Sequence, residues 1–297
     1  MSAKHPVIAV TGSSGAGTTT VKRAFEHIFY REKINPLIIE GDSYHSYDRA
    51  SMKVQMTAEE SQGNKHFSHF GENANLFGKL EDTFKSYAAT GKCQRRYYLH
   101  SDEEAAEHNA RLSTELTPGQ FTPWEDINET TDLLFYEGLH GLVKTDNADV
   151  AQHVDLGVGV VPIVNLEWIQ KIHRDAAERG YSADVIVDTI LRRMPDYVHY
   201  ITPQFSRTDV NFQRVSTVDT SNPFIARDIP TPDESFIVIR FRDPKKFEVD
   251  FPHLLNMISD SFMSRPNTLV VPGGKMGFAM ELILGPKIEL LLEQKRG

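Results

Sequence analysis

A glycine-rich turn near the start of the chain is the feature that most constrains its fold. The apolar run Val7–Val10 leads into Gly12-Ser13-Ser14-Gly15-Ala16-Gly17-Thr18-Thr19-Thr20, and a helix-compatible stretch follows. A short strand, a glycine-rich turn and a helix in this order form the layout of a P-loop. Glycines let successive backbone N–H groups point into one concavity, and the helix N-terminus adds the positive end of its dipole. The turn therefore predicts a site for the phosphates of ATP or GTP.

The turn departs from the usual P-loop pattern at one position. The pattern G-x-x-x-x-G-K-[ST] places a lysine after its last glycine, where this chain has Thr18. Thr19 keeps the hydroxyl that such loops place on Mg²⁺. The charge that the lysine supplies near the β- and γ-phosphates must come from another residue, or else the motif is an ordinary loop.

The composition excludes several classes of protein. The chain has 297 residues, of which 40% are hydrophobic and 25% charged, as in ordinary globular proteins. No apolar stretch approaches the ~20 residues that span a bilayer, and the N-terminus leads into a strand and not into a signal peptide. Cys93 is the single cysteine, which excludes an intramolecular disulfide and a cysteine zinc site, and the net charge of −9 argues against a nucleic-acid partner. We therefore expect a cytoplasmic protein that binds neither membranes nor nucleic acids.

Short apolar runs alternate with helical patterns along the chain, which predicts an α/β fold with a largely parallel sheet. The expected strands are Val7–Val10, Leu37–Ile39, Leu133–Tyr136, Gly157–Val161, Phe236–Phe241 and Thr268–Val271, and the expected helices cover 18–31, 72–89, 165–179, 182–199 and 274–295. Ligands in such folds bind at the carboxyl ends of strands, so polar motifs that follow strands are candidate site residues.

An acidic residue follows the second expected strand. Asp42 lies in Glu-Gly-Asp-Ser-Tyr-His at 40–45, opposite the P-loop. A carboxylate there is placed to accept a proton from a substrate hydroxyl, and His45 and Arg49 could bind an anionic group of that substrate. A turn whose residues only shape the backbone is the alternative.

A second acidic residue, Glu137, follows the apolar run Leu133–Tyr136. In P-loop proteins an acid at the end of such a strand commonly orients Mg²⁺ or its bound water. A capping acid at a strand–turn junction is the alternative.

A third charged group lies on the expected helix 165–179. Lys171, Arg174 and Asp175 share one face of that helix, and Arg179 falls further along the same side. A lid helix of this kind could close on the γ-phosphate and supply the charge that is missing at Thr18. On spacing alone, ordinary i, i+4 ion pairs on a solvated face are the favoured interpretation.

Taken together, these motifs resemble the phosphoribulokinase family in its bacterial type, over essentially the whole chain. The segments that carry the resemblance are Gly-Ser-Ser-Gly-Ala-Gly-Thr-x-Thr at 12–20, Glu-Gly-Asp-x-x-His at 40–45, Phe-Ser-His-Phe at 67–70, Leu-Phe-Tyr-Glu-Gly-Leu-His-Gly at 134–141, Asn-Leu-Glu-Trp-Ile-Gln-Lys-Ile-His-Arg-Asp at 165–175, Ile-Leu-Arg-Arg-Met at 190–194 and Val-Asp-Thr-Ser-Asn-Pro-Phe-Ile-Ala-Arg at 218–227. Thr18 is itself part of that family's pattern, so its departure from the general P-loop supports the resemblance.

The resemblance implies one P-loop kinase domain over residues 1–297, of the phosphoribulokinase/uridine kinase type, with a mixed, mostly parallel sheet flanked by helices. It implies transfer of the γ-phosphoryl of ATP, with Mg²⁺, to the 1-hydroxyl of D-ribulose 5-phosphate, a step of the Calvin cycle. The acid that matches Asp42 is the general base of the family, and those that match Glu137 and Asp175 help to hold Mg²⁺ or the reacting groups.

The resemblance also assigns the substrate contacts. The residues that match His45, Arg49, Tyr98, His100 and Arg179 are associated with binding of the sugar phosphate. Those that match Lys171 and Arg174 are associated with ATP and the transferred phosphoryl, so the lid-helix interpretation becomes the preferred one.

Regulation is implied by the resemblance as well. The bacterial type forms large homo-oligomers, with an octamer as one state, and it is activated by NADH and inhibited by AMP. Arg31, Arg240 and Arg265 match arginines near the effector-binding regions, although surface or interface ion pairs explain them nearly as well. The redox cysteine pair of the plant type is absent, so we expect no thiol switch.

Two other functions stay open at this point. One is a related P-loop kinase that acts on uridine or pantothenate, but such enzymes keep the P-loop lysine. The other is a nucleotide sensor without turnover. The presence of Asp42, Glu137 and the Lys171–Asp175 group argues against that function.

Overall fold

The computed structural model describes residues 5–12, 18–161 and 163–296. The strands are β1 (Val7–Gly12), β2 (Pro36–Glu40), β3 (Gln94–Arg95), β4 (Glu125–Asp126), β5 (Leu133–Gly138), β6 (Leu156–Val161), β7 (Val210–Ser216), β8 (Ser235–Phe241), β9 (Phe262–Arg265) and β10 (Thr268–Pro272). The helices are α1 (Thr18–Arg31), α2 (Arg49–Ser61), α3 (Phe77–Thr90), α4 (Asp102–Leu112), α5 (Val164–Arg179), α6 (Ala183–Asp196), α7 (Pro244–Phe247), α8 (Phe251–Met257) and α9 (Met276–Arg296).

One mixed sheet of eight strands organises the described residues, in the order β2-β5-β1-β6-β7-β8-β10-β9. The first five of these strands are parallel, and β8, β10 and β9 each run antiparallel to the preceding strand in the sheet. β3 and β4 pair separately as a two-stranded ribbon. The predicted α/β architecture with a mixed, mostly parallel sheet is therefore confirmed.

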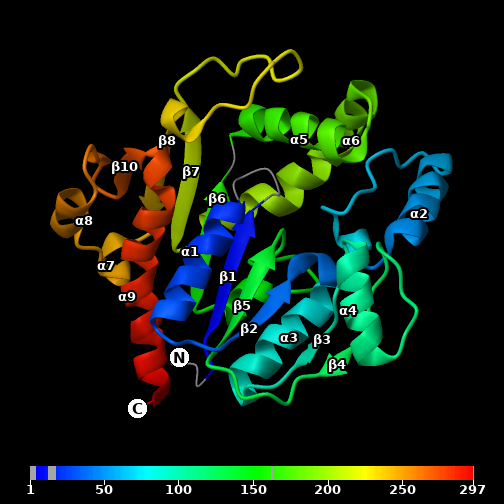
Figure 1. The fold of residues 1–297 in the computed structure, drawn as a ribbon, viewed down its shortest axis with the longest axis horizontal. Helices are drawn as coiled ribbons and strands as arrows, with labels where there is room; N and C mark the ends of the chain where they lie inside the picture. The colour runs from blue at the N-terminus through cyan, green and yellow to red at the C-terminus, as the bar shows by residue number, and fades with distance from the viewer. Residues whose placement is uncertain (1–4, 13–17, 162, 297) are drawn as a thin grey trace.

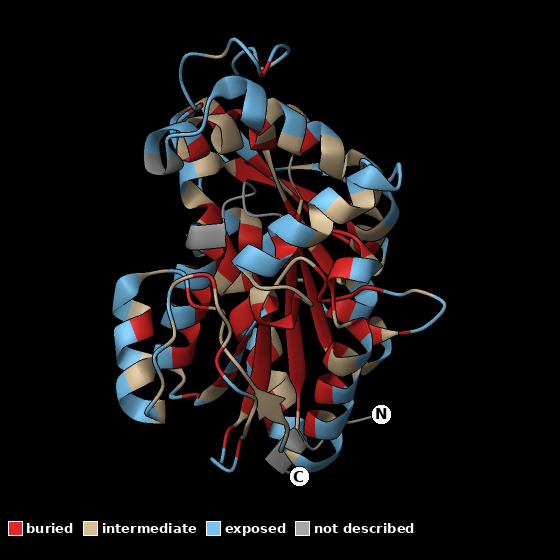
Figure 2. Cartoon of the chain, turned by 90° about the vertical axis from the view of Figure 1, so that its right-hand side faces the viewer, coloured by how far each residue is buried: buried red, intermediate tan, exposed pale blue. Residues whose placement is uncertain are grey.

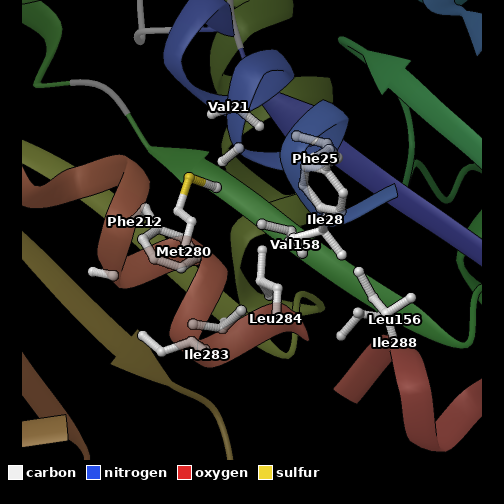
Figure 3. Packing of buried hydrophobic residues seen from close by; sticks show 14 of the residues in the cluster. Val21, Phe25, Ile28, Leu156, Val158, Phe212, Met280, Ile283, Leu284 and Ile288 are labelled. Atoms are coloured by element: carbon white, nitrogen blue, oxygen red, sulfur yellow. The ribbon is translucent and has the colours of Figure 1, made fainter. Parts of the chain in front are cut away.

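Two hydrophobic clusters cover the two faces of this sheet, because successive residues of a strand point to opposite sides. In β1, Ile8 and Val10 join the cluster beneath α1 and α9, whereas Val7 and Ala9 join the cluster beneath α3. Figure 3 shows the first cluster, where side chains of α1, α9, β6 and β7 interlock. Burial on both faces explains why the parallel strands read as continuous apolar runs. Figure 2 shows buried residues concentrated in the strands and exposed ones on the outer surfaces of the helices.

Two expected helices differ from the observed ones by more than two residues at one end. The expected helix at 72–89 begins only at Phe77, since Glu72–Ala74 forms a separate 3₁₀ turn. The expected helix at 182–199 is regular only to Asp196 and continues as the π-helical segment Tyr197–Ile201. Pro195 lies at this transition and cannot donate a backbone hydrogen bond.

The parallel strands bring their carboxyl ends to one edge of the sheet. In Figure 1, α5 and α6 lie beyond the carboxyl end of β1, at the top of the view. Residues that follow β1, β2 and β5 therefore gather at this edge, beneath the two helices.

Candidate active site

The glycine-rich turn follows the central strand β1. The strand ends at Gly12 and α1 begins at Thr18. Five residues of the predicted phosphate site and two further side chains lie outside the described residues; these are Ser13, Ser14, Gly15, Ala16 and Gly17, and the side chains of Thr18 and Thr19. Gly12 must be a glycine, because a Cβ there would lie 2.6 Å from the carbonyl oxygen of Val160. Thr20 is exposed on the first turn of α1.

Asp42 lies in a 3₁₀ turn, Gly41–Tyr44, that directly follows β2. The turn lies close to β5, since a Cβ at Gly41 would come within 2.8 Å of the Cα of Gly138. Tyr44 is buried, and its hydroxyl donates to Thr83 over 2.8 Å. These contacts fix the backbone of the turn, while the Asp42 side chain stays 46% exposed at the edge of the sheet.

The Asp42 carboxylate lies between two imidazoles. Its Oδ1 is 3.4 Å from Nε2 of His45, and its Oδ2 is 3.9 Å from Nε2 of His100. Desolvation would raise the pKa of Asp42, but the hydrogen bond from His45 and the positive charge of His100 outweigh it and hold the pKa below its usual range. Asp42 is therefore ionised at neutral pH and can accept a proton.

Glu40 and Glu137 add two carboxylates beside Asp42. Glu40 is the last residue of β2 and Glu137 the last but one of β5, and the two are paired in register across the sheet. Desolvation, with the negative charges of Glu40 and Asp42, raises the pKa of Glu137 to about 7, although Lys22 opposes the shift. Such an uncompensated acidic pair favours a cation, which would hold both groups ionised.

This donor set fits Mg²⁺ better than a metal held by protein ligands alone. No group of three histidine, cysteine or acidic residues that could hold a metal is present among the described residues. Mg²⁺ is usually held by one or two carboxylates, substrate phosphates and water, so Glu137 beside the P-loop is the kind of ligand that it requires.

The predicted sugar-phosphate residues come from three segments, and two of these residues, His45 and His100, lie beside Asp42. Arg49 begins α2 and is exposed, and its backbone N–H donates to the carbonyl of Gly119 over 2.8 Å. The ring of Tyr98 lies 4.9 Å from that of His100, edge to face. His100 in turn faces Asp42, as described above. The side chain of Arg179 lies outside the described residues.

The charged face of α5 forms a compact ion cluster. Asp175 is 2% exposed and accepts hydrogen bonds from Lys171 and, over 3.0 Å, from Nε of Arg174. Desolvation and the charge of Arg193 lower the pKa of Lys171. Asp175 thus holds two cations of this helix face in place.

A long loop between β7 and β8 braces the outer side of α5. The rings of Trp168 and Phe224 lie 5.5 Å apart, and Nε2 of His173 lies 3.0 Å from the carbonyl oxygen of Ala226. This loop contains residues 218–227, one of the segments that carry the family resemblance. Its contacts support α5.

The sequence of this chain is similar to known proteins over nearly its whole length. Residues 7–221 match the phosphoribulokinase / uridine kinase family. The chain belongs to that family. It is 61% identical over 296 residues to the chromosomal phosphoribulokinase of Cupriavidus necator, covering 100% of this chain and 99% of that protein. It is 58% identical to the phosphoribulokinase of Nitrobacter vulgaris, covering 99% and 98% of the two chains.

A solved structure extends the similarity to three dimensions. The phosphoribulokinase from Rhodobacter spheroides superimposes with a TM-score of 0.89 at 50% identity, over 100% of both chains. The predictions of a P-loop kinase fold, of a bacterial phosphoribulokinase relative and of an ATP-dependent kinase are confirmed by these similarities. None of the described helices has the length and apolar character needed to cross a bilayer.

Four residues near the phosphoribulokinase-like site were not predicted from the sequence. Arg96 donates to the carbonyl oxygens of Ser43 and His45 over 2.7 and 2.6 Å, and burial lowers its pKa to about 10. The other three are His69, Asn75 and Arg193. His69 and Arg193 lie in two of the segments that carry the family resemblance, at 67–70 and 190–194, but no role was predicted for them. Arg96 and Asn75 lie outside these segments, and no sequence pattern pointed to them.

Arg193, on α6, acts electrostatically on both Lys171 and His69. Its guanidinium lies 5.2 Å from the centre of the Phe70 ring. Its charge lowers the pKa of Lys171 on α5 and also that of His69, whose ring lies 4.4 Å from that of His45. The charge of Arg193 therefore influences both Lys171 on α5 and His69 beside His45.

Proposed function

We propose that this member of the family transfers the γ-phosphoryl group of ATP to the 1-hydroxyl of D-ribulose 5-phosphate, giving D-ribulose 1,5-bisphosphate and ADP. The observation that carries the proposal is the ionised Asp42 carboxylate at the end of β2, between His45 and His100. Asp42 takes the hydroxyl proton while a bond forms between that oxygen and the γ-phosphorus. The bond from the γ-phosphorus to the bridging oxygen breaks, and its electron pair leaves with ADP.

The sugar phosphate is bound by the cationic and aromatic groups around Asp42. The exposed Arg49 supplies positive charge for its phosphate, His45 and His100 offer ring N–H donors, and Tyr98 packs against His100. Arg179 is proposed as a further phosphate ligand from the resemblance alone. A neutral acceptor would leave the charge of Arg49 without a partner, which favours a phosphorylated sugar.

The nucleotide is held between the P-loop and the lid. Residues Gly12 to Thr20 bind its phosphates, and Lys171 and Arg174 neutralise the charge that develops on the transferred group. Mg²⁺, held by Thr19 and Glu137 when ATP is bound, supplies further positive charge to the phosphates. We assign Asp175 chiefly to positioning Lys171 and Arg174, since it already accepts hydrogen bonds from both; its role as a metal ligand stays a prediction.

Regulation by NADH and AMP, in a homo-oligomer such as an octamer, is proposed from the resemblance. One observation supports an anion-binding role for two of the expected arginines. Arg240 on β8 and Arg265 on β9 are exposed and flank Thr268 of β10 from its two sides. Arg31 is already ion-paired, with Glu32 and Glu281, so its alternative role in surface ion pairs is better supported.

The extent of the domain and its location in the cell stay predictions. A single domain over 1–297 is supported by the one eight-stranded sheet that runs from β2 to β9. The proposed cytoplasmic location rests on the apolar pattern, the N-terminal sequence and the cysteine content of the chain.

The test is an ADP-release assay with ATP, Mg²⁺ and D-ribulose 5-phosphate, with and without NADH. Turnover with this acceptor, and none with uridine or pantothenate, is the expected result. Stimulation by NADH would support the regulatory proposal separately. Binding of ATP without turnover on D-ribulose 5-phosphate would contradict the proposed acceptor.

A further inference from the structure

We propose that Asn75 is a positioning residue that fixes the protonation pattern of His45, so that His45 meets Asp42 as a hydrogen-bond donor and a cation. This inference rests on the proposed roles of Asp42 and His45. It concerns a residue that touches neither substrate nor nucleotide in the proposed mechanism and acts only through the imidazole beside the base.

The amide orientation of Asn75 is determined by its surroundings. Its Nδ2 donates to the carbonyl oxygens of His69 and Gly71, over 2.8 and 2.6 Å, and the residue is 8% exposed. The reversed amide would place Oδ1 against two carbonyl oxygens, with no donor between them. Oδ1 of Asn75 is therefore the atom that faces Nδ1 of His45, at 2.8 Å.

This orientation places a proton on Nδ1 of His45. An amide oxygen can only accept, so Nδ1 must donate. The other ring nitrogen, Nε2, lies 3.4 Å from Oδ1 of Asp42. A neutral His45 with its proton on Nδ1 would direct the Nε2 lone pair at an ionised carboxylate. The favourable arrangement is an imidazolium that donates from both nitrogens, to Asn75 and to Asp42.

The backbone keeps the two residues in this register. His45 and Asn75 form an isolated antiparallel bridge. The N–H of Leu76 donates to the carbonyl of Tyr44 over 2.8 Å, and the N–H of Ser46 donates to that of Ala74 over 2.9 Å. Asn75 is thus attached to the same turn region that carries Asp42, and His45 has little freedom to turn away.

The neighbouring imidazole, His69, does not carry a second positive charge beside His45. Its ring lies 4.4 Å from that of His45. Burial and the positive charges of His45 and Arg193 lower the pKa of His69 to about 3, so it is neutral. Of these two tilted rings, His45 is thus the one that faces Asp42 and the one to which the proposal assigns the charge.

The effect of Asn75 on His45 should change substrate binding more than proton transfer. With Asn75 in place, the pair of Asp42 and His45 is neutral overall, and His45 offers positive charge to an anionic acceptor. Without Asn75, His45 can carry its single proton on Nε2 and still donate to Asp42. The pair then has a net negative charge, which disfavours the phosphate of the sugar.

The kinetic test is a double-mutant cycle between Asn75→Leu and His45→Phe, in which Phe keeps an aromatic ring against His69. In the wild-type background, Asn75→Leu should raise the KM for D-ribulose 5-phosphate about fivefold or more and leave the KM for ATP unchanged. In the His45→Phe background, Asn75→Leu should raise that KM by less than about twofold. An equal increase in both backgrounds would show a merely structural role and overturn the proposal.

A matched control is Asn211→Leu, which removes another amide that donates to a carbonyl, on β7 and away from His45. We expect it to lower stability without changing the KM for the sugar phosphate. If His45→Phe itself leaves that KM unchanged, the proposed role of His45 fails, and the inference on Asn75 is then decided by spectroscopy.

The spectroscopic test uses the wild-type protein and so does not depend on a variant that folds. With ¹⁵N-labelled histidine, NMR should show both ring nitrogens of His45 protonated at neutral pH, with the signal assigned by its loss in His45→Phe. In Asn75→Leu, Nδ1 should lose its proton. A wild-type His45 without a proton on Nδ1 would overturn the proposal.

Discussion

At the scale of single residues, the site is built on a carboxylate whose environment favours its ionised form. Asp42 is ionised because two imidazoles face its two oxygens, whereas Glu137, which lacks such partners, has a pKa raised to about 7. Two acids at the ends of neighbouring strands thus have different properties. The first is suited to accept a proton and the second to share a cation.

The role of Asp42 as base predicts the effect of its removal. Asp42→Asn keeps the size of the side chain and removes the proton acceptor, so kcat should fall by roughly 10²–10⁴-fold. Binding of an ATP analogue, measured by calorimetry, should be unchanged, because the P-loop lies on another strand. An unchanged kcat would remove Asp42 from the mechanism.

Arg49 should discriminate between the two substrates. It is exposed at the start of α2, and among the described residues its side chain has no ion-pair partner. Arg49→Ala should raise the KM for D-ribulose 5-phosphate by roughly 10-fold or more, as for a lost charged hydrogen bond, and leave the KM for ATP nearly unchanged. Lys53→Ala, which removes another exposed cation of α2, is the control and should change neither. Equal changes in both KM values would contradict the assignment.

At the scale of elements, the sequence predicted the strands and motifs that depend on local pattern. β1, β5 and β6 were found because both of their faces are buried, and Asp42 and Glu137 were found because they follow such runs. β7 was missed because Asn211, Gln213 and Arg214 interrupt its apolar pattern. Arg96 and Asn75 were missed because their roles arise from contacts with the distant turn at 41–45, which no local pattern encodes.

The ion cluster of Lys171, Arg174 and Asp175 on α5 predicts how the stability of the protein depends on pH. Although desolvation opposes ionisation, Lys171 and Arg174 hold the pKa of Asp175 below its ordinary value. The unfolded chain therefore takes up the proton first as pH falls, so the stabilisation is present above the ordinary carboxyl pKa and is lost as pH falls through the folded value. Asp175→Asn should cost on the order of 3 kcal/mol at pH 7, because two partly buried cations lose their partner.

Urea unfolding of wild type and Asp175→Asn across pH 3.5–8 measures this effect. The difference in stability should be constant above about pH 6 and shrink as pH falls below about 4. Asp184→Asn, at an exposed position in the first turn of α6, is the control and should show little difference at any pH. A pH-independent difference for Asp175→Asn would show that packing, and not charge, is responsible.

At the scale of the whole molecule, the core connects the C-terminal helix to the nucleotide site. α9 packs on α1, the helix that begins at the P-loop, and the contact is made by fully buried side chains such as Phe25, Ile28 and Leu284 (Figure 3). The chain from β8 to α9 thus packs with α1 on the face of the sheet opposite α3. The antiparallel strands at this end complete the core that anchors α1.

This arrangement predicts a stability defect with little direct effect on chemistry. Leu284→Ala removes a fully buried side chain between α9 and the sheet, so the free energy of unfolding should fall by about 2–5 kcal/mol. Leu191→Ala, whose side chain is 52% exposed on α6, should change it by less than about 0.5 kcal/mol. Because Leu284 lies away from the strand ends, the KM for ATP of folded Leu284→Ala should stay near the wild-type value well below its melting temperature. A raised KM for ATP in the fully folded variant would contradict this. It would mean that α9 also determines the position of α1, and with it that of the phosphate site.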